Sequence, residues 1–197
     1  MGAYTTDLTV IHSRKPIESI DDLKGLKLSA NNSAGAEALQ RLGAIPTVGE
    51  AHRVTEAIGQ GSLDGVAFSP IALFQFGVAE VAMNHYLLGI GSAPLALVMN
   101  RKTFDGLPEA AKTIIRKYSG EWAAAAWIKS FGAEEKRLLD KVKADPAHHV
   151  VEPSPSDIKV AQAIYRSMID AWAAKSAHNR ELKTMVEKEL ATIRSDQ

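Results

Sequence analysis

The fold is decided by Leu23–Ser29 (LKGLKLS), Leu42–Val48 (LGAIPTV) and Gly59–Pro70 (GQGSLDGVAFSP). Each stretch contains a short predicted strand next to a glycine, at Leu26–Ser29, Ile45–Val48 and Gly65–Phe68. The segments between them, Ser33–Leu42 and Glu50–Ile58, have helical composition and end at glycines. Strands that alternate with helices are typical of a parallel sheet, so this stretch predicts an α/β fold.

The rest of the chain extends this pattern and then changes character after residue 108. Further strands are predicted over residues 8–12, 81–90, 95–100 and 148–151. Helices are predicted over 70–76 and 108–144, from 155 to at least 172, and from about 179 to 193. We therefore predict an α/β fold with a mixed, mostly parallel sheet, followed by long C-terminal helices. Residues 1–106 are expected to form a ligand-binding lobe, and residues 107–197 a helical region packed on that lobe.

Three tryptophans lie in the apolar stripes of the predicted helices, and we expect them in the core: Trp122, Trp127 and Trp172.

Composition excludes several classes of function. The chain has 197 residues, with 23 basic and 23 acidic side chains, and its formal net charge is zero. No overall field therefore draws it to nucleic acid, and no nucleic-acid partner is expected. It has no cysteine, so disulfides and thiolate metal sites are excluded. No apolar run approaches the length of a membrane-spanning helix.

Motifs for catalysis, metals and cofactors are missing from the sequence. There is no HExxH, GxSxG, GxGxxG or GxxxxGK[ST] pattern, and the six histidines show no metal-ligand spacing. Adjacent His148 and His149 would point to opposite faces of a strand. We therefore expect no metal, no cofactor and no enzymatic activity, and we interpret the histidines as structural or solvated.

Small polar residues follow the predicted strands and could line a binding crevice. Strand ends in open α/β sheets meet at one edge, where hydroxyls, amides and helix N–H groups can hold a carboxylate. The candidate ligand-binding residues are Ser29, Asn31, Asn32, Arg53, Phe68 and Ser69. Four of them have a plainer interpretation: Asn31 and Asn32 turn the chain before a helix that Ser33 caps, Phe68 is a core residue and Arg53 is a solvated charge.

A family resemblance is carried by several segments in a fixed order along most of the chain. They are Lys15–Lys27 (KPIESIDDLKGLK), Leu42–Ala44 with Pro46, Glu56–Ile58 leading to Gly61, Asp64 and Gly65, Leu97–Arg101 (LVMNR), Leu107–Glu109 and Ser119–Gly120. These segments resemble the solute-binding proteins of tripartite ATP-independent periplasmic (TRAP) transporters, of the DctP type. The chain resembles only the second lobe and the C-terminal helices of such a protein.

The resemblance implies a fold and a function. The family's two α/β lobes close on a ligand like a clamshell, which implies capture of a small organic acid for a TRAP-type membrane permease without catalysis. A periplasmic location is expected if a signal peptide lies upstream, since the first seven residues lack that pattern. The family carries a carboxylate-binding arginine where this chain has Ser29. Arg53 is the candidate for a displaced positive charge.

Two alternatives stay open from the sequence. A single lobe would bury only one side of a ligand, so we expect weak or absent binding by this chain alone. The alternative function is a structural protein that self-associates as a homodimer or covers a partner through its apolar surface. An enzyme is the least favoured class, because no nucleophile–base pair or metal cluster is visible.

Overall fold

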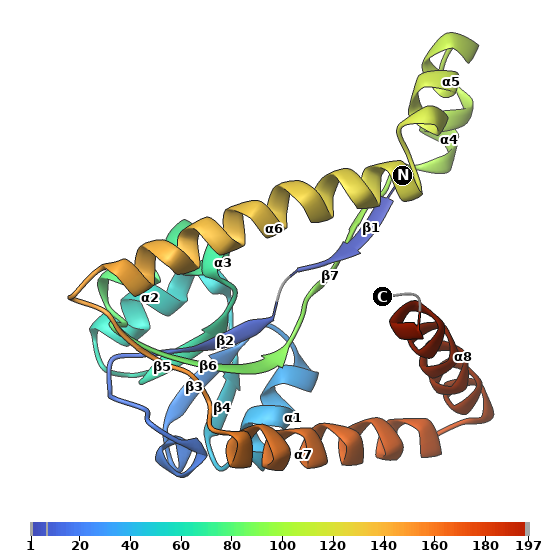
Figure 1. The fold of residues 1–197 in the computed structure, drawn as a ribbon. Helices are drawn as coiled ribbons and strands as arrows, with labels where there is room; N and C mark the ends of the chain where they lie inside the picture. Colours follow the sequence, from blue (N-terminus) through green and yellow to red (C-terminus); the bar gives the residue numbers. More distant parts are fainter. Residues whose placement is uncertain (1, 7, 196–197) are drawn as a thin grey trace. The chain divides into compact units, whose positions relative to one another are not determined.

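The computed structural model describes residues 2–6 and 8–195. The strands are β1 (Gly2–Thr5), β2 (Thr9–Ser13), β3 (Lys27–Ala30), β4 (Ile45–Val48), β5 (Gly65–Phe68), β6 (Asn84–Gly91), β7 (Pro94–Leu97) and β8 (His149–Val151). The helices are η1 (Ile20–Leu23), α1 (Ser33–Arg41), α2 (Ala51–Gly59), α3 (Pro70–Gln75), η2 (Val78–Glu80), α4 (Arg101–Asp105), α5 (Glu109–Lys117), α6 (Glu121–Ala144), α7 (Pro155–Ala174) and α8 (Ala177–Ser195). The predicted fold class is confirmed (Figure 1).

The main sheet brings three strand ends to one edge. Among the described residues it contains six strands, in the order β4-β3-β5-β2-β6-β8. The pairs β3–β4, β3–β5 and β6–β8 are parallel, and β2 runs antiparallel to both β5 and β6. The carboxyl ends of β3, β4 and β5 therefore lie together, as the sequence predicted.

The two faces of this sheet are covered by different helices. The chain passes from β3 to β4 through α1, and from β4 to β5, on the other side of β3, through α2. Right-handed crossovers then place α1 and α2 on opposite faces. On the α2 face, one buried cluster joins Val54 and Ile58 of α2, Leu73 of α3 and Val142 of α6 to the sheet. This cluster seats the carboxyl-terminal half of α6 on the sheet.

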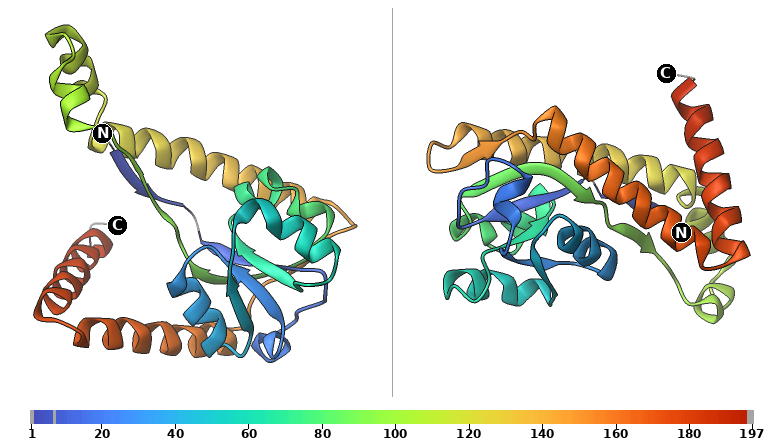
Figure 2. Two further views of the ribbon diagram at one scale, coloured as in Figure 1. Left: turned by 180° about the vertical axis from the view of Figure 1, so that it is seen from behind. Right: turned by 90° about the horizontal axis from the view of Figure 1, so that it is seen from below.

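A two-stranded ribbon of β1 and β7 carries the other half of α6. The strands pair antiparallel, and the ribbon extends away from the main sheet alongside α6 (Figures 1 and 2). Tyr4 of β1 packs its ring against Trp127 at 4.8 Å and against Phe131 at 5.2 Å between ring centroids. These aromatic contacts, with burial of Ala123, dock α6 on the ribbon.

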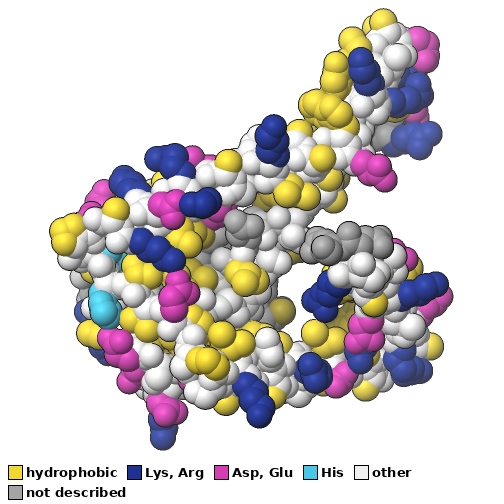
Figure 3. Space-filling model, in the orientation of Figure 1, with side chains coloured by type: hydrophobic (Ala, Val, Ile, Leu, Met, Phe, Trp, Pro, Cys, Tyr) yellow, Lys and Arg dark blue, Asp and Glu magenta, His cyan; other side chains and the backbone are white. Residues whose placement is uncertain are grey.

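The expectation that all three tryptophans are core residues is wrong. Trp122 is 55% exposed and Trp172 is 41% exposed, whereas Trp127 packs on Tyr4. Ala123 is buried on the ribbon, whereas the neighbouring Trp122 lies on an uncovered face of α6 and packs its ring against Tyr118, with 4.7 Å between ring centroids. Figure 3 shows hydrophobic side chains exposed around α4 and α5.

Helix boundaries follow local signals in the sequence. The predicted helix over 108–144 divides at Gly120, whose φ of 62° is left-handed, while Gly132 stays inside α6. Ser154 caps α7 by accepting a hydrogen bond from the N–H of Asp157 at 3.1 Å, and Pro155 opens the helix as predicted.

The chain forms two compact units, Met1–Pro153 and Ser154–Gln197. The second unit consists of α7 and α8, which contact each other. The division lies after Pro153 rather than after residue 106, because α6 packs on β1 and α3. A functional boundary at residue 106 stays a prediction.

No helix in the described part of the chain combines the length and the apolar character that crossing a membrane requires.

Candidate functional site

An open cavity lies at the carboxyl-terminal edge of β3 and β4, on the face that α2 covers. Its volume is about 360 Å³. The strands contribute Ser29 and Thr47, the following turn contributes Gly49 and Glu50, and α2 contributes Arg53. Val54, Ala57 and Leu63 form its apolar floor. The cavity therefore has hydroxyls, one carboxylate and one guanidinium around an apolar base.

Ser29 enters this cavity because of its register in the sheet. It lies opposite Thr47 of β4 and Val66 of β5 in the parallel pairs. Residues at the same register point to the same face, and Val66 belongs to the cluster under α2. Ser29 itself is 2% exposed. The side chain is thus a fixed hydroxyl at the inner wall of the cavity.

Arg53 supplies the positive charge of the cavity rim. Its side chain is 78% exposed, and its Nε lies 3.4 Å from Oε2 of Glu50, one turn earlier. His52 approaches the same carboxylate at 3.3 Å. The backbone N–H groups at the start of α2 have no side-chain cap from Glu50, and a helix start favours anions. An anionic group could therefore bind here by displacing Glu50 from Arg53.

The two asparagines after β3 are not in the cavity lining. Asn32 caps α1, since its side-chain oxygen accepts a hydrogen bond from the N–H of Gly35 at 2.8 Å. Asn31 is exposed in the bend before this cap. Asn32 rather than Ser33 thus caps this helix, and a role of Asn31 or Asn32 in binding stays a prediction.

Phe68 and Ser69 end β5 at the same sheet edge, but they do not line the cavity either. Phe68 is 1% exposed and packs its ring against Phe76, with 5.6 Å between centroids. Ser69 caps α3 by accepting from the N–H of Ala72 at 3.4 Å. The buried carboxylate of Glu135 on α6 accepts from the N–H of Ile71 at 3.2 Å. Phe68 is thus a core residue, and Ser69 lies in a turn that hydrogen bonds at Ala72 and Ile71 hold in place.

Six of the eight lining residues were not among those predicted from the sequence: Thr47, Gly49, Glu50, Val54, Ala57 and Leu63. Thr47 is the third residue of β4, and Gly49 is the first residue after that strand. The signal that identified Ser29, a small polar residue at a strand end, applies equally to Thr47. Gly49 is recognised only in the structure, where a side chain at this position would lie 3.6 Å from the hydroxyl of Ser29.

Three of the six histidines meet in the interior of the same unit. His12 and His85 are buried. Hydrogen bonds between ring nitrogens join His12 to His85 and His85 to His148. His149 instead binds Glu18 at 2.8 Å, so the two adjacent histidines have different partners. In the part of the chain that the structure describes, no three His, Asp or Glu side chains are grouped so as to hold a metal ion.

The arrangement as a whole is suited to holding a small polar solute. The cavity offers hydrogen-bond donors and one cation at a rim that solvent can reach. Its described lining pairs no nucleophile with a base that could activate it.

Comparison with known proteins gives the same picture. The family model for bacterial extracellular solute-binding protein, family 7 (DctP), matches residues 3–176. The chain is 29% identical over 122 residues to the C4-dicarboxylate-binding periplasmic protein DctP of Rhodobacter capsulatus, covering 61% of this chain and 37% of that protein. It is 30% identical over 168 residues to a solute-binding protein of Sulfitobacter sp. (strain NAS-14.1), covering 83% and 49% of the two chains.

A solved structure has the same fold. The periplasmic ectoine-binding protein of the TeaABC TRAP transporter of Halomonas elongata superimposes with a TM-score of 0.84 at 20% identity. The match covers 96% of this chain and 63% of that one. The chain spans less than half the length of these two curated relatives. The resemblance that its sequence motifs indicated is confirmed.

Proposed function

Because the chain belongs to the bacterial extracellular solute-binding protein family 7, we propose that it forms part of a TRAP-type solute receptor that captures a small organic acid for a membrane permease. The cavity between β3, β4 and the start of α2 forms one wall of the ligand site. Binding involves no bond making or breaking. The receptor acts in the periplasm, where the DctP protein of Rhodobacter capsulatus is placed by its name.

A single observation carries this proposal. Ser29 and Arg53, which were both selected as binding residues from the sequence, line one cavity at the edge where three strands end. The hydroxyls of Ser29 and Thr47 can donate to a carboxylate, and Arg53 supplies the opposite charge. Serine cannot reproduce the two-pronged contact of an arginine, so Arg53 takes over the electrostatic role in this chain.

The cavity is open to solvent on one side, so binding by the chain alone is expected to be weaker than micromolar. We suggest titrating the labelled chain with succinate, a C4-dicarboxylate, and with the zwitterion ectoine, while recording amide NMR shifts. Shifts at Ser29, Thr47 and Gly49 are expected for at least one of these acids. Arg53→Gln should remove them. Arg101→Gln is the matched control, since Arg101 is also exposed and also pairs with a carboxylate, that of Asp105.

The outcomes separate two claims. Shifts that map elsewhere, or that survive Arg53→Gln unchanged, would refute this cavity as the ligand site. A micromolar dissociation constant would leave the site intact and overturn only the expectation of weak binding.

Self-association is the second candidate function, and one observation favours it. Apolar side chains that a stable monomer seldom leaves uncovered are exposed on β7 and its end and on α5 and α6 of the first unit: Leu95, Leu97, Val98, Met99, Ile114, Tyr118, Trp122, Ile128 and Phe131. Sedimentation velocity across a range of concentrations tests it. A homodimer supports this second candidate, and a monomer at all concentrations refutes it.

A further inference from the structure

A chain of three imidazoles runs through the first compact unit. Nδ1 of His12 lies 2.7 Å from Nδ1 of His85, and Nε2 of His85 lies 2.7 Å from Nδ1 of His148. At its other end, Nε2 of His12 lies 3.2 Å from the carbonyl oxygen of Phe68. The chain thus joins β2, β6, the turn before β8, and the last residue of β5.

The carbonyl oxygen of Phe68 determines the direction of all three hydrogen bonds among these imidazoles. A carbonyl oxygen only accepts, so Nε2 of His12 carries the hydrogen and donates to Phe68. A neutral His12 then has a bare Nδ1, which accepts from the Nδ1–H of His85. His85 in turn has a bare Nε2, which accepts from the Nδ1–H of His148. One tautomer of each ring satisfies all three bonds.

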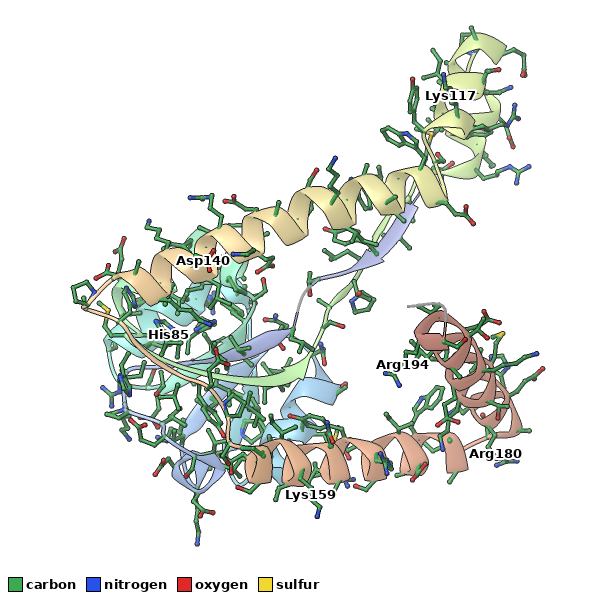
Figure 4. All side chains as sticks on the ribbon, in the orientation of Figure 1. His85, Lys117, Asp140, Lys159, Arg180 and Arg194 are labelled. Atoms are coloured by element: carbon green, nitrogen blue, oxygen red, sulfur yellow. The ribbon has the colours of Figure 1, made fainter. Side chains whose placement is uncertain are left out.

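The rings are held in this arrangement by the sheet. His12 lies directly opposite His85 in the β2–β6 pair and opposite Val66 in the β2–β5 pair. Both histidines therefore point to the face that α2, α3 and α6 cover, and they are 2% and 1% exposed. Figure 4 labels His85 in this part of the structure. With no solvent at these two rings, only the chain itself satisfies their nitrogens.

The charged groups around the chain are mostly paired with one another. Asp145, in the turn after α6, lies 4.0 Å from Nε2 of His148. From the other neighbouring segments, Arg14 and Lys15 bind the carboxylate of Asp64, His149 binds Glu18, and Lys143 binds Glu152. The electrostatic influence on His12 comes from His85 and His148, and that on His85 from His148.

We propose that His12, His85 and His148 act as one positioning unit, which holds the ring of His12 against the Phe68–Ser69 turn at the strand-end edge and lets that turn loosen when proton uptake breaks a link between the rings. The carbonyl that His12 holds belongs to the residue just before Ser69, the cap of α3. That this turn borders a ligand site rests on the proposed function. The hydrogen-bond chain itself does not depend on it.

Proton uptake has a different effect at each ring. A proton on Nε2 of His148 breaks no bond of the chain and faces Asp145. A proton on Nε2 of His85 or on Nδ1 of His12 turns an acceptor into a second donor and breaks the link between two rings. The Nε2–H of His12 still donates to Phe68, but the ring of His12 is then no longer held from its other side, and the turn that it contacts loosens. Burial, reinforced by the neighbouring imidazoles, lowers the pKa of His12 to about 3 and that of His85 to about 4. The hydrogen bonds between the three imidazoles are therefore intact at neutral pH and break only in acid.

Two measurements without any ligand test the proposal. Long-range ¹⁵N–¹H NMR at neutral pH should show the hydrogen on Nε2 of His12 and on Nδ1 of both His85 and His148. Amide hydrogen exchange at Ala72 and Leu73, which bond to Ser69, reports the order of the turn. Their protection, corrected for intrinsic exchange rates, should fall as the pH drops toward about 4.

Variants distinguish an effect of the three-histidine hydrogen-bond chain from a general loss of stability. His148→Ala leaves Nε2 of His85 without a donor, and it should reduce protection at the two amides by about tenfold or more. His148→Asn retains a donor near the Nδ1 position and should restore most of the protection. His149→Ala, one residue further on and outside the chain, is the control and should change nothing at the turn.

Three results would overturn the proposal: a different tautomer at His12 or His85, equal effects of the changes at residues 148 and 149, or protection at the turn that does not change in acid. Because no ligand is used, these failures are distinct from a failure of the proposed binding site.

Discussion

Lowering the pH from about 7.5 to about 5 should destabilise the first unit strongly, because two histidines are buried as neutral rings. Burial is the largest cause that lowers the pKa of His12 to about 3, and repulsion from His85 adds to it. Burial is also the main cause that lowers the pKa of His85 to about 4, with His148 contributing. In the unfolded chain both return to the ordinary value of 6.5.

The sign follows from which state binds more protons. At a pH between the folded and unfolded pKa values, the two histidines bind more protons in the unfolded state than in the folded state, so lowering the pH favours unfolding. At about pH 5 each unfolded histidine gains about 2 kcal/mol from protonation, from RT ln(1 + 10^1.5). The two together should lower the free energy of unfolding by about 4 kcal/mol. This stability is complete above the ordinary pKa and is lost as the pH falls below it.

Urea unfolding followed by tryptophan fluorescence measures this loss. A Trp172→Phe background removes the tryptophan of the second unit, so that the signal reports on Trp122 and Trp127 in the first. His149→Ala, in the same background, should keep the full pH dependence. His85→Leu should remove about half of it, since one of the two titrating groups is gone. A loss below about 1 kcal/mol between the two pH values would refute the buried neutral pair.

Four further substitutions are tested by unfolding in urea. Those at residues 65, 132 and 64 use the fluorescence assay above, and the one at residue 154, in the second unit, uses far-UV circular dichroism with Trp172 retained. Gly65→Ala should cost at least about 3 kcal/mol, because the new Cβ would clash with the carbonyl oxygen of His12, whereas Gly132→Ala should stabilise the open face of α6 by about 1 kcal/mol. Ser154→Ala should cost the second unit about 1 kcal/mol and reduce its helical circular dichroism, since the cap of α7 is lost; an unchanged spectrum and midpoint would contradict that role. Asp64→Asn should cost about 2 kcal/mol at neutral pH. Burial acts to raise the pKa of Asp64, but the bonds from Lys15 and from the N–H of Lys27 hold this pKa below the ordinary 3.8. The difference in free energy of unfolding between Asp64→Asn and wild type should therefore shrink as the pH falls below 3.8. A difference that stays constant with pH would contradict this role of the carboxylate.

Local signals predicted most of the secondary structure. Ile45–Val48 and Gly65–Phe68 were predicted with the bounds that the structure has, and α7 begins at Pro155 as expected. Apolar runs between glycines and capping residues before helices depend on neighbours in the chain, so they can be recognised from sequence. The site was predicted less completely: Ser29 and Arg53 share a cavity, but Asn32 and Ser69 cap helices and Phe68 lies in the core.

The sequence by itself determined the α/β class, the sheet edge where a solute could bind and the family, because strand–helix alternation and ordered motifs are local properties. Tertiary structure alone decided which polar residues face the cavity, that Trp122 is left exposed beside a narrow ribbon, and that His12, His85 and His148 form one chain. Those three histidines are separated by 73 and 63 positions. Their contact arises from the register of strands that are distant in sequence, and no local pattern encodes that register.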